Sequence, residues 1–474
     1  MFRISFVENL QRVVPARAVE RLTPVAALID SILYASDEIS VSRRIALFSF
    51  SVRIVSAAIA YFSQVLLARW MGDYQYGVFV VVWIGTVILG GLAGLGFQVA
   101  VLRLIPEYRV RNQTDLLRGI ILGSRLNALL VATLVAAVGA AGLYVFGDRL
   151  ESYYLIPLYL AAIVLPMQAI GEIQDGVARG FNWADLSLWP GFVVRPLLII
   201  LFMWLALTNG APATAVTAMG AVIAAAWLTT IGQLFVLRRR IRREVPAGPR
   251  AYAPATWVAL ALPVFVVEGF FSLLTNVDIL IVGYLMAPDQ VAVYFAAAKT
   301  LALVHFVYFA VRVGSAPRFS QYHAAGDTVR LAAFVRDTLH WTFWPSLALV
   351  GLMLVFGNYL LMLFGPSFTA GYPLLWMLSI GLLLRASIGP GETLLVMAGQ
   401  QHLCAWIYAG AFVLNVVLNF SLIPYFGLMG AAAATSITLA AETLFLFLVA
   451  YYRLGISCSI LTAFRQPRPA LEVS

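Results

Sequence analysis

The chain has 474 residues, of which 62% are hydrophobic and 11% are charged. Soluble domains carry about 25% charged residues, so this composition excludes a soluble globular protein and indicates an integral membrane protein. The net charge is +9, but the arginines form short clusters beside apolar runs without interleaved aromatic residues. We therefore expect no nucleic-acid partner.

The first 44 residues mix arginines with Pro15 and Pro24 and contain no continuous apolar segment before a small-residue cleavage site. We expect a cytoplasmic tail there, not a cleaved signal peptide; an interfacial amphipathic segment is the alternative. From Ile45 onward, apolar runs recur almost to the C-terminus. At about 20 residues per crossing they predict about twelve transmembrane helices and an all-α multipass fold. The predicted spans are residues 45–70, 77–101, 119–146, 154–178, 186–208, 214–237, 256–285, 291–316, 338–364, 373–398, 402–424 and 429–452.

The arginines predict the orientation of these spans. Of the 31 Lys and Arg residues, 23 fall in the two tails and the even-numbered loops, two (Arg69 and Arg149) at the odd-numbered loops, and six within spans. Cytoplasmic loops carry the excess of positive charge in membrane proteins. Both termini and the basic segment 238–255 are therefore expected on the cytoplasmic side of the membrane.

Two weak internal repeats indicate a duplicated architecture. Residues 68–79 align with residues 283–294 in the turn after the first helix of each half, and residues 145–148 align with residues 355–358 after the third helix. Such a repeat predicts two six-helix bundles of like orientation, with a substrate site between them, as in secondary transporters. The expected parts are a tail (1–44), an N-terminal bundle (45–237), a basic linker (238–255), a C-terminal bundle (256–452) and a tail (453–474).

An ordered set of motifs also carries a family resemblance over roughly residues 44–455. In chain order these motifs are Leu67–Gly72 with Tyr76–Gly77, Gly94–Phe97, Arg103–Tyr108, Ala178–Gly180, Arg195–Pro196, Asn276–Asp278, Gly365–Phe368, and Leu418–Pro424 with Gly430–Ala432. The set resembles the polysaccharide (Wzx-type) flippases of the multidrug/oligosaccharidyl-lipid/polysaccharide exporter superfamily. The resemblance implies a fold like that of the multidrug and toxin extrusion transporters. It also implies translocation of polyprenyl-diphosphate-linked oligosaccharide repeat units for lipopolysaccharide O-antigen, exopolysaccharide or capsule, with membrane lipids, a polysaccharide polymerase and chain-length proteins as partners.

Cations inside the predicted spans are the candidate substrate-binding residues. A lipid-linked diphosphate carries about two negative charges, whose hydration must be replaced by donors within the membrane. We predict that the four deepest cations bind it: Arg53, Arg195, Lys299 and Arg385. Arg125 and Arg312 lie nearer the cytoplasmic ends, where an arginine also serves as a structural or headgroup contact.

The acids within the spans are candidates for ion coupling or charge pairing: Glu268, Asp278, Glu392 and Glu442. Asp278 and Lys299 lie about ten residues to either side of the turn at 288–289, at similar depth, which predicts a buried pair. Glu392 follows Arg385 by seven residues, nearly two helical turns, which predicts alternating charges along one face. The sequence does not decide which acid, if any, carries a coupling proton.

The sequence lacks the motifs of several other functions. It has no P-loop, no metal-ligand spacing among its four histidines and two cysteines, and no loop long enough for a soluble active site. We therefore expect no catalytic residue, no cofactor and no metal. Two rival functions share the predicted fold: a cation-coupled multidrug exporter, which needs a surplus of deep acids, and a peptidoglycan-precursor flippase.

Overall fold

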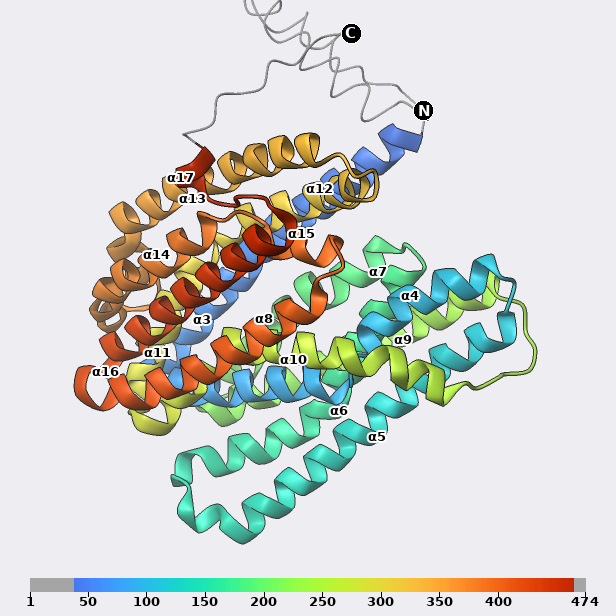
Figure 1. Cartoon of the computed structure of the whole chain (residues 1–474). Helices are drawn as coiled ribbons and strands as arrows, with labels where there is room; N and C mark the ends of the chain where they lie inside the picture. Colours follow the sequence, from blue (N-terminus) through green and yellow to red (C-terminus); the bar gives the residue numbers. More distant parts are fainter. Residues whose placement is uncertain (1–37, 464–474) are drawn as a thin grey trace, which may run out of the picture. The chain divides into compact units, whose positions relative to one another are not determined.

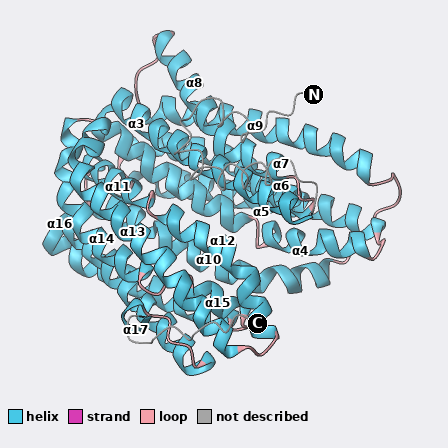
Figure 2. Ribbon diagram, turned by 90° about the horizontal axis from the view of Figure 1, so that it is seen from above, coloured by secondary structure: helices cyan, strands magenta, loops and turns pink. Residues whose placement is uncertain are grey.

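A computed structural model describes residues 38–463, with side chains from Val55 onward. The described chain is helical and contains no strand (Figure 2). Residues up to Ala57 and residues from Ala58 onward form separate compact units. Within the second unit we distinguish a first half, Ala58–Glu244, and a second half, Pro254–Ala463.

The first half contains helices α3 to α9. Helix α3 begins at Glu38, before the first residue of this half. Their bounds are α3 Glu38–Ala93, α4 Phe97–Val110, α5 Thr114–Phe146, α6 Ser152–Gly180, α7 Ala184–Trp189, α8 Arg195–Thr208 and α9 Ala215–Glu244. A short 3-10 turn, Gly147–Arg149, follows α5, and a π-helical turn, Pro190–Val194, joins α7 to α8. Helix α6 is central, because α4, α5 and α9 all pack against it.

The second half contains the helices from α10 onward. Their bounds are α10 Pro254–Leu285, α11 Pro288–Ala302, α12 His305–Ala324, α13 Thr328–Phe364, α14 Tyr372–Ala386, α15 Gly391–Met397, α16 Gln401–Leu454 and α17 Ile460–Ala463, with a 3-10 turn at Pro366–Gly371. Helix α16 packs against α10 and α14. Figure 1 shows α13, α14 and α16 (orange to red) running beside one another, and α5 and α6 (cyan to green) likewise side by side.

The described helices confirm the multipass prediction. Nine of them are long and apolar enough to cross a membrane, and the pair α11–α12, bent by 41°, raises the number to ten. Two of these spans contain kinks, at Gly72 and Gly427. Dividing both spans at these glycines brings the total to the predicted twelve.

Three of the predicted spans are interrupted. The second breaks at Gly94–Gly96, where Gly96 has a φ of 77° that glycine adopts without strain. The tenth breaks between α14 and α15 at Gly389-Pro390, where Gly389 has a φ of 53° and the proline cannot continue the helical hydrogen bonds. The eighth breaks at Leu303–Val304, where the backbone bonds shorten to the i to i−3 pattern although no glycine or proline is present.

Three apolar cores show how the halves pack together. One core combines residues of both halves near the odd-numbered loops, such as Tyr76 and Phe79 with Phe295 and Phe364. A second core lies near the even-numbered loops of the first half, and a third near those of the second half. Apart from the start of α10, which joins the core of the first half, the described halves share their packing at the odd-loop end alone.

Close polar and backbone contacts reinforce this shared end. Arg69 donates from Nε to the carbonyl oxygen of Leu363 (2.6 Å) and from Nη2 to that of Met362 (2.9 Å), so it caps the last turn of α13. A Cβ added at Gly77 would lie 1.7 Å from the carbonyl oxygen of Pro288. Glycine at this position therefore lets α3 approach the start of α11.

Candidate functional site

A buried ion-pair network surrounds Arg385, near the end of α14. Its Nε lies 2.9 Å from Oε1 of Glu442 on α16, and its Nη2 lies 3.3 Å from Oε2 of Glu392 on α15. The three side chains are at most 12% exposed. Arg385 and Glu392 were expected close together and are in contact. They meet across the turn at 387–390, however, and do not lie along one continuous helix face as predicted.

Helix α12 completes this Arg385 network. The hydroxyl of Tyr308 donates to Oε2 of Glu392 (3.0 Å), and Nη2 of Arg312 lies 3.6 Å from Oε1 of the same carboxylate. The ring of Tyr308 also lies 5.1 Å from the guanidinium carbon of Arg385. Glu392 thus receives charge-assisted bonds from two helices besides its own, so the network links α12, α14, α15 and α16.

Glu268 extends the network toward the first half. This side chain is exposed in the middle of α10, and it interacts electrostatically with Arg312, with Glu392 and with Arg179 at the end of α6. Because Arg179 belongs to the first half and Arg312 to the second, Glu268 faces cations of both halves. Within the second half alone, the network has three acids against the two arginines Arg312 and Arg385, so the surplus charge there is negative, and Arg179 of the first half balances it.

Lys299 is not held by an acid in this way. Its ammonium lies 5.0 Å from the ring centre of Phe295, and it interacts electrostatically with Asp278 without a direct ion pair among the described residues. The Asp278 carboxylate instead accepts bonds from Tyr294 Oη (2.7 Å) and Thr435 Oγ1 (3.3 Å). The predicted buried Asp278–Lys299 pair is therefore wrong as a direct contact, because neighbouring hydroxyls occupy the carboxylate.

The bend of the eighth span lies between Lys299 on α11 and the members of the Arg385 network on α12. His305 begins α12 directly after the break, is exposed, and interacts electrostatically with both Lys299 and Arg385. Broken helices within a membrane expose backbone groups, and transporters use them at binding sites. His305 thus lies within electrostatic range of both Lys299 and Arg385.

A second polar network lies in the first half. Arg195 donates from Nη1 to Oε1 of Gln168 (2.6 Å), and Nε2 of Gln168 donates to Glu172 (3.2 Å). Asp175 accepts from Nε2 of Gln233 (2.7 Å). Arg195 follows the π-helical turn, and such turns often occur at functional sites. Its Nε atom is buried and has no hydrogen-bond partner in the structure, so one donor is left for a ligand or water.

Arg53, the fourth predicted substrate-binding cation, lies in α3, but its side chain is outside the part of the chain described. Of the other three, Arg385 pairs with two acids, Arg195 bonds an amide, and Lys299 contacts no acid within the part of the chain that the structure describes. The structure therefore distributes the predicted cations over different environments.

Sequence reasoning missed the uncharged partners of the charged residues, such as Tyr308 beside Glu392, Gln168 beside Arg195 and Thr435 beside Asp278. One signal was present, because Tyr308 precedes Arg312 by four residues and so lies on the same helix face. Among the described residues, no three His, Cys, Asp or Glu side chains gather to hold a metal ion.

Two family models match this chain. One, described as polysaccharide biosynthesis protein, matches residues 43–323, which is more than half of the chain, and the other, MatE, matches residues 263–421. The chain belongs to the polysaccharide biosynthesis protein family. The resemblance inferred from the sequence motifs is therefore confirmed at the level of the family.

Relatives and solved structures extend this assignment. A probable low-salt glycan biosynthesis flippase of Haloferax volcanii is 23% identical over 83% of this chain and 80% of its own length. An uncharacterized membrane protein of Methanocaldococcus jannaschii is 24% identical over 80% and 78%. An inward-facing multidrug resistance MATE family transporter of the MOP superfamily superposes with a TM-score of 0.70 (14% identity; 86% of this chain, 98% of that one).

The lipid II flippase MurJ superposes with a TM-score of 0.68 at 14% identity, over 88% of this chain and 91% of that one. These likenesses show that this member of the polysaccharide biosynthesis protein family has the MATE fold. At such low identity they show nothing about its substrate.

Proposed function

We propose that this protein is a flippase that carries a polyprenyl-diphosphate-linked oligosaccharide across the cytoplasmic membrane for surface polysaccharide biosynthesis. Family membership and the relative described as a glycan biosynthesis flippase support the proposal. The observation that carries it is Lys299, a cation within a broken membrane helix, which no acid of the described residues contacts. An unpaired ammonium at this depth is costly unless an anion joins it.

The diphosphate would bind where Lys299 and His305 meet the edge of the Arg385 network. Arg385 keeps one buried donor, Nη1, without a partner. Arg195 keeps Nε in the same way, so each half offers at least one unused guanidinium donor. A shared anionic ligand that contacts both halves would favour one of their arrangements over the other, which is what transport requires.

The acid surplus around Glu268, Glu392 and Glu442 would serve as a coupling site. A proton or another cation that binds there would weaken the hold of these carboxylates on Arg385 and Arg312. This surplus is also the observation that favours the second candidate, a cation-coupled multidrug exporter. Asp278 remains a candidate for coupling, because its carboxylate is buried among hydroxyls.

The membrane arrangement is part of the proposal. We propose the cytoplasmic (inner) membrane, with both termini and the 238–255 segment inside, and two six-helix bundles at 45–237 and 256–452. In that orientation the core that both halves share would lie toward the outer side of the membrane. Membrane lipids, a polysaccharide polymerase and chain-length proteins would be its partners.

Complementation tests the function. In a strain that lacks the gene, Lys299→Gln should lose polysaccharide export while its membrane level stays normal, whereas Lys299→Arg should retain export. Arg330→Gln is the matched control, because this cation is exposed and pairs with Asp327 outside both networks. Normal export by Lys299→Gln would contradict the assigned role, and drug hypersensitivity with intact polysaccharide would favour the multidrug exporter.

A further inference from the structure

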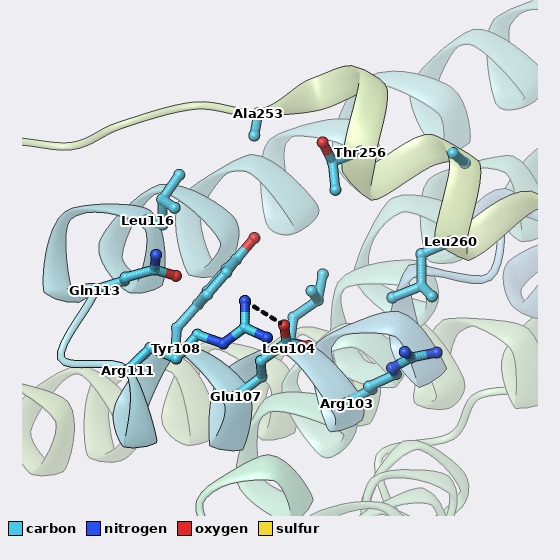
Figure 3. A pocket seen from close by; sticks show the side chains of 11 residues that line it. Arg103, Leu104, Glu107, Tyr108, Arg111, Gln113, Leu116, Ala253, Thr256 and Leu260 are labelled. Atoms are coloured by element: carbon cyan, nitrogen blue, oxygen red, sulfur yellow. Dashed lines mark ion pairs between the residues drawn. The ribbon is translucent and has the colours of Figure 1, made fainter.

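A groove lies between α4 and the first turns of α10, away from both polar networks (Figure 3). Its volume is about 490 Å³. One wall comes from α4 in the first half, with Arg103, Glu107 and Arg111, and the other from α10 in the second half, with Thr256 and Leu260. The groove therefore joins the two halves at the even-loop end, where their packing is otherwise separate.

The groove is held in shape without any ligand. The indole nitrogen of Trp257 donates to the hydroxyl of Tyr108 (2.9 Å), which fixes the start of α10 on α4. Arg118 donates to the carbonyl oxygens of Pro246 (2.6 Å) and Pro249 (2.8 Å), so the segment that leads into α10 is also fixed. A preformed site loses less conformational entropy when its ligand binds.

Contacts at its inner side show that the groove is not a route into the protein. A Cβ at Gly96 would lie 2.3 Å from the carbonyl oxygen of Ala261, so the backbones of α4 and α10 touch there. The bond between Trp257 and Tyr108 adds a second barrier. A molecule in the groove would therefore be a resident ligand and not cargo on its way across the membrane.

The charges of the groove favour an anion. Arg111 pairs with Glu107 (3.1 Å), whereas Arg103 has neither an ion pair nor a hydrogen bond among the described residues. Gln113 and Thr256 add uncharged donors at the rim, and Figure 3 shows Arg103 and Gln113 toward opposite ends of the groove. The surplus charge of the lining is one positive charge, which suits a monoanionic phosphate diester.

The surface next to the groove favours a ligand with an apolar tail. Ala259, Pro263 and Val266 follow one another at intervals of four and three residues on α10 and are exposed, and Ala259 also lines the groove. This spacing forms one apolar stripe that begins beside the groove. Leu260 and Leu104 provide apolar lining within the groove itself. A phosphate with acyl chains fits both the charge and the stripe.

We propose that this groove binds the headgroup of an anionic phospholipid from the cytoplasmic leaflet, with its acyl chains along the α10 stripe. The bound lipid would contact both halves and so stabilise the arrangement in which α10 is docked on α4. The proposal does not depend on which substrate the protein transports.

Purified full-length protein in detergent tests the site. Native mass spectrometry would count retained lipids, and thermal unfolding would be followed with added phosphatidylglycerol, phosphatidylcholine or sodium phosphate. Phosphatidylglycerol should remain bound and raise the unfolding midpoint, while phosphatidylcholine and phosphate should have little effect. Equal effects of both lipids would refute the charge recognition, and an equal effect of phosphate would refute the role of the tail.

Three variants separate specific binding from general attraction. Arg103→Gln should weaken phosphatidylglycerol binding about tenfold, the loss of one charge-assisted contact. The control Arg239→Gln removes an exposed arginine of α9 outside the groove and should change binding less than twofold. Glu107→Gln should strengthen binding, because it frees Arg111. Equal losses in the two arginine variants, or weaker binding in Glu107→Gln, would overturn the proposal.

Discussion

Replacement of Arg385 by glutamine should destabilise the protein more than any other single change in its network. Arg385 contacts two carboxylates, Glu392 and Glu442, and the three side chains are at most 12% exposed. Removal of one partner from a buried ion pair costs about 3–5 kcal/mol, because the remaining charge stays buried without compensation. Arg385→Gln leaves two such acids, so we expect the upper part of this range.

Glu442→Gln should cost less, about 1–3 kcal/mol, since Arg385 keeps its contact with Glu392. The double variant should be no less stable than Arg385→Gln alone, because the second change removes an acid that the first left unpaired. The exposed pair Arg330–Asp327 is the control, and Arg330→Gln should cost less than about 1 kcal/mol.

Unfolding of the purified variants in mixed detergent micelles measures these differences. The signature of the network is the non-additivity of the Arg385 and Glu442 changes. If their costs simply add, or if Arg385→Gln matches Arg330→Gln, the buried network does not contribute as described.

Three further predictions concern the shared end and the C-terminal segment. Gly77→Ala should lower the free energy of unfolding by about 1–3 kcal/mol, because its Cβ would collide with Pro288. The control Gly85→Ala adds a Cβ that meets nothing within 4 Å, so it should be neutral or stabilising. Equal stability of the two variants would contradict the close approach of α3 to α11. Arg69→Gln removes the bonds from α3 to the end of α13. It should widen the distribution of distances between spin labels at the exposed positions Tyr74 and Tyr359 in a cysteine-free background. An unchanged distribution would refute the role of Arg69 in holding the two halves together at the odd-loop end. Burial raises the pKa of the Cys458 thiol to about 12, so maleimide should not label it at pH 8 in the folded protein. The thiol of the unfolded chain ionises near pH 8.5, so the contribution of Cys458 to stability should be present below that pH and be lost as the pH rises toward 12. Rapid labelling of Cys458 at pH 8 would contradict its burial. Stability that does not fall above pH 8.5 would contradict it as well.

The membrane fold was predictable because hydropathy and arginine asymmetry act over whole spans. The predicted helix boundaries were less accurate wherever the backbone geometry interrupts a span. Gly389 and Pro390 signalled the break before Glu392, but Leu303 and Val304 carry no such signal, and the bend there follows from local 3-10 hydrogen bonds. His305 begins the helix after that bend and interacts electrostatically with both Lys299 and Arg385.

Charged candidates were easier to find than their partners. A lone arginine or glutamate in an apolar run is visible in the sequence, so Arg385, Glu392 and Glu442 could be named. Their pairing depends on helix packing, which spacing alone did not determine. Asp278 is an example. It was expected at the same depth as Lys299, but its carboxylate accepts hydrogen bonds from Tyr294 and Thr435 instead. Tyrosine and threonine are common in apolar helices, so the sequence did not indicate that their hydroxyl groups would contact this carboxylate.

Reconstitution tests the central claim most directly. Purified protein in proteoliposomes would be supplied with a fluorescent polyprenyl-diphosphate-linked oligosaccharide, and its transfer between leaflets would be followed by accessibility of the sugar to an external glycosidase. The wild-type protein should transfer this lipid between leaflets. Transfer by Lys299→Gln should be at least about tenfold slower, which corresponds to the loss of one ionic contact. Transfer by Lys299→Arg should remain close to the wild-type rate. Absence of transfer by the wild-type protein, together with uptake of organic cations by the same vesicles, would contradict the flippase assignment.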